Sequence, residues 1–510
     1  MSLRDNRRRF SPDPLRGCEN GATRGEVGMT RRFFIGGLAA AAGTAACPAF
    51  LRAGAARAGG ERLRIGVISD PHLLWPGDEN LLMNAFAYFR DNGADGVLLA
   101  GDFADWARYE QIKRLGACWD KVFPDNRAPD GRHVEKLFIY GNHCVTPWTW
   151  GTDFKDKEDK AYREAIGYKN NKARFWEECL HEKFEPVWLK TVKGVPIIGA
   201  HWEWNGLDCS NLIPVHNRRI AEFFRKHGKD LDPKLPFVFT QHDHPKDTCF
   251  GAWAWGHDDG TATRELSPFP NAVAFTGHSH FALTDERSVW QGAFTSVNTG
   301  SLRYPALTYS LRENAETNCS GYRGEKRKHR MKRLKTDNGQ GLLVSLWDDH
   351  MAIERRDFLY GESLGDDWVV PLPAAEGAPF SYAHRAARRT APEFDAGAKA
   401  TVTVAKPKDE KDFTHVDVAF PAAKAKNGCR VCEYEVTAVL VEDDVELVQA
   451  QRRMFSPDFH LPVSKLLPSA TLTFAAEDLP MKGHYRFEVR ALECFGKKGG
   501  KIVSDPILLI

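Results

Sequence analysis

The chain lacks an excess of charge of either sign. Its 70 Lys and Arg residues nearly balance 68 Asp and Glu residues, so the net charge is only +2 over 510 residues. Such a balance gives no whole-protein argument for binding nucleic acid or a membrane surface, and we expect no specific nucleic-acid binding. The hydrophobic content of 42% and charged content of 27% are those of a globular protein. The chain is longer than a single hydrophobic core can organise, which predicts two or three domains.

The chain also lacks a cysteine framework. Cys18 and Cys47 lie in the N-terminal segment, and the remaining nine of the eleven cysteines are odd in number and irregularly spaced. This pattern excludes a disulfide scaffold. Cys429 and Cys432 form a C-x-x-C without a second pair to complete a zinc site. They are either a local disulfide or two inert thiols.

A third absence is that of a long apolar run near the N-terminus. Residues 36–51 follow Arg31-Arg32, are rich in small residues, and are too short for a comfortable membrane span. With Ala56-Arg57-Ala58 as an A-x-A cleavage site, the segment resembles a twin-arginine export signal. We therefore predict that residues 1–58 are a leader.

The predicted mature chain begins near Gly59, has no transmembrane domain, and is periplasmic or extracellular, either free or attached to the cell surface. Met29 is an alternative start of translation. An uncleaved anchor helix and a lipid attached at Cys47 are the alternatives to cleavage.

Residues 59–360 alternate strand and helix signals. Short apolar or β-branched runs predict buried strands at 63–69, 96–100, 136–140, 196–200, 237–241 and 272–276. Leu82, Ala85, Phe86 and Phe89 share one helical face. Further helices are expected at 105–120, 158–182 and 215–228. The alternation predicts an α/β domain, closed by a hairpin of residues 341–347 and 351–358.

Polar residues directly follow five of these strands. They are Asp70 and His72, Asp102, Asn142 and His143, His242 and His244, and His278 and His280. Ligands bind outside the carboxyl ends of strands in such sheets, so these side chains are expected to converge. Asp, Asn and His suit Mn, Fe or Zn, and a carboxylate that bridges two ions suits displacement at phosphorus.

The motifs occur in an order that resembles a known family. D-x-H at Asp70, G-D-x-x-D at Gly101, G-N-H at Gly141, a histidine after a strand at His242, and G-H-x-H at Gly277 resemble the calcineurin-like metallophosphoesterases. The resemblance implies a four-layer α/β/β/α sandwich for residues 59–360.

The resemblance also implies roles for individual residues. Two divalent or trivalent metal ions, of Mn, Fe, Zn or Mg, would be held by Asp70, His72, Asp102 and His280 on one side and by Asp102, Asn142, His242 and His278 on the other. A hydroxide that bridges the metals would attack the phosphorus of a phosphate mono- or diester. His143 would assist the leaving group, and Asp105 would orient His143.

Some residues depart from the patterns of particular branches. Asp105 stands where purple acid phosphatases have a ligating tyrosine, and Trp106 stands where protein Ser/Thr phosphatases have an arginine. Both branches are therefore disfavoured. Cys144 replaces the acidic residue that follows G-N-H in many relatives. His242 directly follows its strand and is preferred to His244 as the ligand, so that His244 is left to face the substrate.

Other substrate contacts rest on position alone. Arg303 follows a strand that begins near Phe294 and is a candidate phosphate contact. His201 and Trp202 follow another strand and either line the cleft, where Trp202 stacks on a base or sugar ring, or pack in the core. The expected substrate is a phosphorylated small molecule, a nucleotide or a lipid.

A basic insertion interrupts the domain at about 310–340. Its dense run 324–335 either attracts an anionic surface or is a solvated loop.

The amino-acid composition changes after residue 360. Residues 361–399 are rich in Pro, Ala and Gly and are predicted to be a linker. Residues 400–510 carry short alternating runs without helix signals, which predict a small all-β sandwich that resembles a fibronectin type III module.

Together these features predict an exported dinuclear metal-dependent phosphoesterase. The alternative is a degenerate, non-catalytic protein of the same fold that binds a phosphorylated ligand or a polysaccharide.

Overall fold

The computed structural model describes most of the chain beyond the predicted leader. The described residues are 60–105, 107–145, 171–203, 216–250, 258–307, 334–335, 339–375, 377–406, 413–426, 428–443 and 445–510. The leader 1–58, Trp106, residues 158–170 of a predicted helix, and residues 324–333 of the basic run lie outside them. Among the described helices, none combines the length and apolarity needed to cross a membrane.

The first sheet contains the strand that leads to Asp70. Its strands are β1 (Leu63–Ile68), β2 (Gly96–Leu99), β3 (Glu135–Phe138), β12 (Gln340–Leu346), β13 (His350–Asp357), β14 (Glu362–Ser363) and β15 (Trp368–Pro371). The order is β14-β13-β12-β1-β2-β3, with β15 beside β13. Strands β1, β2 and β3 run parallel. Strands β12 and β13 pair antiparallel, which confirms the predicted hairpin.

The second sheet contains the strand that leads to His278. Its strands are β4 (Val187–Val192), β5 (Val195–Ala200), β6 (Phe237–Thr240), β7 (Ala272–Thr276), β8 (Val289–Gln291) and β9 (Thr295–Asn298). They are ordered β4-β5-β6-β7-β9-β8, and β5, β6, β7 and β9 run parallel. Val67, Val273 and Val344 belong to one buried apolar cluster, which packs the two sheets face to face.

Helices cover the outer face of each sheet. Helices α1 (Glu79–Asp91), α2 (Tyr109–Val122) and α5 (Asn171–Leu180) cover the first sheet, and α6 (His216–His227) and α7 (Thr261–Leu266) cover the second. The predicted face of α1 is buried at Leu82, Ala85, Phe86 and Phe89. The α/β/β/α sandwich is therefore confirmed. Short α3 (Asn142–Val145) follows β3, and β10 (Ala306–Leu307) pairs with β11 (Leu334–Lys335).

The segment 361–399 is not a simple linker, and this prediction was wrong. Strands β14 and β15 extend the first sheet through β13, and α8 (Tyr382–Arg388) follows them. Trp368 and Val370 are buried in the core between the sheets. The sequence did not indicate this strand, because the segment is rich in Pro and Ala and only alternate residues of the short β15 face the core.

The C-terminal region is all β, as predicted. Its strands are β16 (Thr401–Ala405), β17 (His415–Pro421), β18 (Glu433–Glu442), β19 (Val445–Phe455), β20 (Ser469–Ala475), β21 (Gly483–Leu492), β22 (Ile502–Val503) and β23 (Ile507–Leu509). They form a β16-β17-β20 sheet and a β19-β18-β21-β22 sheet in which β23 also pairs with β21. The hydroxyl of buried Tyr485 donates to the carbonyl of Met481 at 2.7 Å, as in the tyrosine corner of immunoglobulin-like sandwiches.

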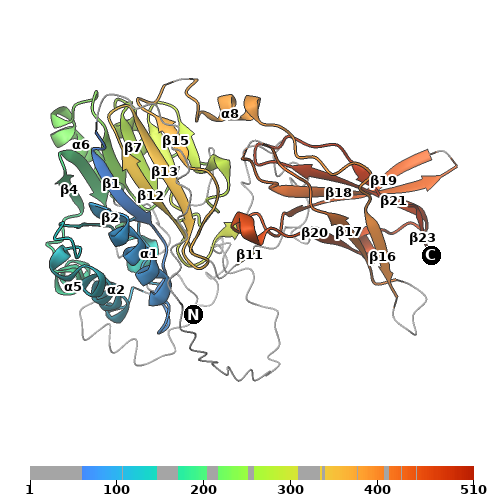
Figure 1. Cartoon of the computed structure of the whole chain (residues 1–510), viewed down its shortest axis with the longest axis horizontal. Helices are drawn as coiled ribbons and strands as arrows, with labels where there is room; N and C mark the ends of the chain where they lie inside the picture. The colour runs from blue at the N-terminus through green and yellow to red at the C-terminus, as the bar shows by residue number, and fades with distance from the viewer. Residues whose placement is uncertain are drawn as a thin grey trace, which may run out of the picture.

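The C-terminal β-domain packs on the α/β part of the chain near α8. Figure 1 shows β16 to β23 at one end of the molecule, with α8 above the junction. An apolar cluster joins Ala282 to Phe455 and Phe459. The buried carboxylate of Glu286 pairs with Arg385 and Arg389. These ion pairs hold the α8 segment, and Lys497 Nζ of the β-domain donates to the carbonyl of Arg389 at 2.6 Å. Apolar contacts and hydrogen bonds thus connect the two parts.

Candidate metal centre

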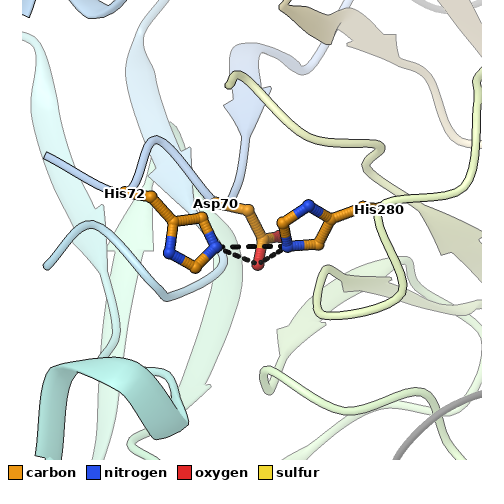
Figure 2. A group of neighbouring side chains, drawn as sticks. All are labelled: Asp70, His72 and His280. Atoms are coloured by element: carbon orange, nitrogen blue, oxygen red, sulfur yellow. Dashed lines mark hydrogen bonds and ion pairs between the residues drawn. The ribbon is translucent and has the colours of Figure 1, made fainter. Parts of the chain in front are cut away.

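The first group of side chains joins the ends of β1 and β7. Asp70, His72 and His280 are buried and point toward one another (Figure 2). His280 Nε2 lies 3.0 Å from Asp70 Oδ1, and His72 Nε2 lies 3.2 Å from His280 Nε2. The loops are aligned by backbone bonds, because His72 N donates to the carbonyl of Asp102 at 3.0 Å.

The second group joins the ends of β2, β6 and β7. Asp102, His242 and His278 offer ligand atoms that all lie within 4.8 Å of one another. Asp102 Oδ2 lies 3.0 Å from His242 Nε2, and His278 Nδ1 lies 3.2 Å from that same nitrogen. Asp102 also belongs to a group with His72 and His143, so its carboxylate lies between the first and second groups.

The backbone at the site adopts conformations that most residues avoid. Positive φ angles occur at Asp70, His72, Asp102, His278 and His280, with values of 54°, 44°, 51°, 67° and 56°. Such conformations cost about 1–3 kcal/mol each and persist only where the surroundings hold them. A Cβ at Gly141 would collide with the Asp102 carboxylate, and one at Gly277 would lie 2.6 Å from Asp70 Oδ2. These glycines allow the close approach of the loops.

Each of three histidines is oriented through its Nδ1 atom. The Nδ1 of His72 bonds Asp105 Oδ1 at 2.8 Å, that of His242 bonds the carbonyl of Ala100 at 2.7 Å, and that of His280 bonds the carbonyl of Tyr304 at 3.2 Å. These partners leave Nε2 of each ring directed at the carboxylates. This is the arrangement found around histidines that ligate metals.

The donor set fits metal ions. In each group, ring nitrogens of two histidines lie 3.2 Å apart. At this distance, two protonated nitrogens repel each other. A cation between buried carboxylates and imidazole nitrogens removes that conflict, and this mixed O and N set suits Mn, Fe or Zn.

The charges in the second group compensate one another. Burial raises the pKa of Asp102, but the charges of His242 and His143 outweigh it and lower that pKa to about 2. Burial lowers the pKa of His242, yet Asp102 raises it to about 10. Burial and the charge of His242 lower the pKa of His278 to about 3. A metal that binds here displaces the proton of His242, so binding releases protons.

His143 and Asp105 lie beside both groups. His143 N donates to Asp102 Oδ1 at 2.8 Å, and its Nδ1 bonds the backbone carbonyl of Asp105 at 3.0 Å. The Asp105 carboxylate lies 3.4 Å from His143 Nδ1 but bonds His72 at 2.8 Å. Asp105 therefore contacts His143 as expected, but its carboxylate is closer to His72.

Asn142 opens α3 between two residues that contact Asp102, namely Gly141 and His143. This position is next to the second group, and its assignment as a ligand stays a prediction.

Two of the expected substrate contacts lie in the core instead. His201 is fully buried, its Nδ1 accepts from Tyr140 N at 3.0 Å, and its ring packs against Trp176. His244 is also fully buried and is held between Thr276 Oγ1 and Ser279 Oγ at 2.7 and 2.8 Å. Both therefore brace the strand ends rather than face the substrate, because their rings are enclosed by neighbouring elements.

The other two expected contacts have mixed outcomes. Trp202 is 6% exposed and belongs to the core beside α2 and α5, which favours its packing alternative. Arg303 Nη1 donates to the carbonyl of His72 and to Asp78 Oδ2, the latter at 2.7 Å. Arg303 thus lies beside the first group, where a role in phosphate binding stays a prediction.

The sequence did not reveal Tyr304 as part of the site. Its carbonyl orients His280, and its ring lies 4.5 Å from the His280 ring and 6.1 Å from the His72 ring, centroid to centroid. A carbonyl carries no residue-type signal. Only its place three residues after Ser301 hints at this position.

Comparisons with known proteins agree with the motifs. A family model described as calcineurin-like phosphoesterase matches residues 63–282. No curated protein matches the chain. Similar solved structures include a dimetal phosphatase from Danio rerio, 11% identical over 61% of this chain and 99% of that chain with a TM-score of 0.30.

Two further solved structures match a similar share of the chain. A purple acid phosphatase from yellow lupin is 12% identical over 61% of this chain and 53% of that chain, with a TM-score of 0.35. A predicted phosphoesterase from Streptococcus pneumoniae is 11% identical over 61% and 97%, with a TM-score of 0.25.

Residues 63–282 form a calcineurin-like metallophosphoesterase domain, as the family match and the four-layer fold agree. Domains of this class hydrolyse phosphoric esters, and the chain is an enzyme of that kind.

Proposed function

We propose that the chain is an exported phosphoesterase that uses two metal ions to hydrolyse a phosphate mono- or diester. The observation that carries the proposal is the position of Asp102, whose carboxylate is within reach of His242 and His278 on one side and His72 on the other. A carboxylate between two sets of ligands suits a bridge between two cations.

The proposed ligands follow the two groups. Asp70, His72, Asp102 and His280 would hold one ion, and Asp102, Asn142, His242 and His278 would hold the other. Ions bound there would supply Lewis acidity toward phosphoryl oxygens and lower the pKa of water. The carbonyl of Ala100 and the carboxylate of Asp105 hold Nδ1 of His242 and of His72, which would leave Nε2 of each ring available to an ion.

His143 is the proposed catalytic residue. Its Nδ1 is held by the carbonyl of Asp105 and its Nε2 lies 3.9 Å from Asp102 Oδ2, so the outer ring nitrogen borders the metal groups. In this position Nε2 donates a proton to the leaving oxygen, or a hydrogen bond to the charge that develops on it.

Export and the class of the C-terminal domain are further parts of the proposal. The twin-arginine motif at Arg31-Arg32 supports a periplasmic or extracellular location. The tyrosine corner at Tyr485 and the two-sheet strand order support a fibronectin type III-like domain.

The proposal is tested by turnover of simple esters. Purified chain is treated with a chelator, supplied separately with Mn²⁺, Fe²⁺, Zn²⁺ or Mg²⁺, and assayed with an aryl phosphate monoester and an aryl phosphate diester. We expect hydrolysis of at least one ester, lost with chelator and restored by metal. Metal binding without turnover of either ester would favour the non-catalytic alternative, and absence of metal binding would refute the proposal.

A further inference from the structure

Gln340 connects three separate parts of the chain. The residue begins β12 and is fully buried. Its Oε1 accepts from Leu283 N at 2.8 Å, and its Nε2 donates to the carbonyl of His460 at 2.8 Å. Its backbone N–H donates to the carbonyl of Ser301 at 2.7 Å. One side chain thus bonds both the phosphoesterase domain and the C-terminal β-domain.

Two of these partners lead directly to the first metal group. Leu283 lies three residues after His280 in the chain. Ser301 Oγ donates to the carbonyl of Asp70 at 3.2 Å and accepts from Tyr304 N at 3.2 Å. The carbonyl of Tyr304 in turn orients the His280 ring. Gln340 is therefore separated from Asp70 and His280 by a single intervening residue or a short loop.

The third partner brings in the C-terminal β-domain. His460 lies between β19 and β20, next to Phe459, which packs in one apolar cluster with Phe455 and Ala282. Ala282 is 1% exposed and is only two residues beyond His280. The β-domain thus covers the segment that follows the metal-binding turn. Gln340 lies between the two and holds this segment in place, because it bonds Leu283 in the segment and His460 in the β-domain.

We infer that Gln340 is a positioning residue through which the C-terminal β-domain holds Asp70 and His280 in place for metal. The inference rests on the proposed function, since it concerns the same metal site. It gives the β-domain a task within the enzyme itself.

The physical reason is the loss of two buried hydrogen bonds. Without the amide of Gln340, the N–H of Leu283 and the carbonyl of His460 each lose the bond that Gln340 makes to them. The segment from His280 to Leu283 then shifts to recover those bonds. Metal sites tolerate displacements of only about 0.5 Å, and loss of outer partners commonly weakens metal binding about 10–100-fold.

The test measures Mn²⁺ affinity of the full chain by calorimetric titration. Gln340→Met keeps the size of the side chain and removes its hydrogen bonds. We expect about 10-fold weaker Mn²⁺ binding, the lower end of the range for outer partners. Should this variant be insoluble, Gln340→Asn replaces it, because the shorter side chain cannot span Leu283 and His460 together.

Gln291 provides a matched control. It is 1% exposed and makes three side-chain bonds, to Thr295 Oγ1, the carbonyl of Pro371 and Phe380 N, compared with two for Gln340. None of these partners leads to a metal group. We expect Gln291→Met to bind Mn²⁺ like the unchanged chain, even where both variants lose stability.

Three results separate the hypotheses. Unchanged affinity in Gln340→Met overturns the inference. Equal weakening in Gln291→Met also overturns it, because the effect is then one of general destabilisation. Failure of the unchanged chain to bind Mn²⁺ or any other tested divalent metal refutes the proposed function instead.

Discussion

The two groups of metal-ligating side chains are supported by different parts of the chain. In the second group, His242 is oriented by the carbonyl of Ala100, directly at the end of β2. In the first group, His280 depends on the carbonyl of Tyr304, which is linked through Ser301 to Gln340. The second group is therefore contained within the span from β2 to β7, whereas the first also draws on later segments.

This difference separates two ways of building a site. The second group lies where the end of β2 in the first sheet meets the ends of the adjacent parallel strands β6 and β7 in the second, and residues at these three strand ends hold it directly. The first group in addition depends on Ser301, Tyr304 and Gln340, which lie beyond these strand ends. We expect the first group to be the more sensitive of the two to changes in distant parts of the fold.

The largest effect is expected where the two groups meet. Asp102→Ala removes the carboxylate near both, and we expect loss of metal from both groups and of all metal-dependent turnover. Elemental analysis and ester assays measure these. Asp95→Ala is a matched control, since Asp95 is 3% exposed and pairs with Lys193 at the opposite end of β2. Retention of full metal content in Asp102→Ala would contradict the bridging role.

The next largest effect concerns chemistry without metal loss. His143→Ala is expected to keep its metal content and lose about 10²–10⁴-fold in kcat, the usual contribution of a general acid. Elemental analysis is run beside the kinetics on the same sample. Loss of metal would instead identify His143 as a ligand, and unchanged kcat would remove it from the catalytic step.

A smaller effect should distinguish the two groups from each other. Asp105→Asn removes the charge that bonds His72 Nδ1 at 2.8 Å, while the carbonyl that orients His242 is untouched. We expect one of two metal-binding steps to weaken about 10–100-fold while the other is retained. Two distinct steps in an Mn²⁺ titration would report this, and equal weakening of both would show that the groups are not independent.

The smallest of these effects should lie in the β-domain alone. Tyr485→Phe removes the hydrogen bond to Met481 and is expected to lower the free energy of unfolding by about 1 kcal/mol. Urea unfolding measures the loss, and Mn²⁺ affinity should stay unchanged because no contact of Tyr485 leads to His460. A change in metal affinity would mean that any loss of β-domain stability reaches the site.

Strand ends were predictable because they are coded locally. Asp70, Asp102 and His278 each follow a short apolar run, and a glycine precedes Asp102 and His278, so sequence alone indicated where the chain would turn. The predicted Asp and His residues of both groups lie together, whereas Asn142 stays a prediction. The apolar face of α1 was equally legible, since helical spacing alone defines it.

Other features depend on contacts that no local pattern encodes. A histidine after a strand has the same local sequence signal whether it faces a cleft or the core, and His201 and His244 prove to be buried. The preference of Asp105 for His72 over His143 depends on two loops that meet only in the fold. The bond from Gln340 to His460 spans 120 residues.

The left-handed backbone conformation at Asp70 also limits which substitutions the site can accept while the chain stays folded. Asn tolerates the φ of 54° at Asp70 better than Ala does, because its short polar side chain can bond locally. In the presence of chelator, the free energy of unfolding of Asp70→Asn should therefore exceed that of Asp70→Ala by about 1 kcal/mol. Urea unfolding of the two variants measures this difference. The reverse order would show that the backbone at Asp70 imposes no such limit. A lineage that loses catalysis by the first route keeps the folded arrangement of the other site residues, from which a binding protein can descend.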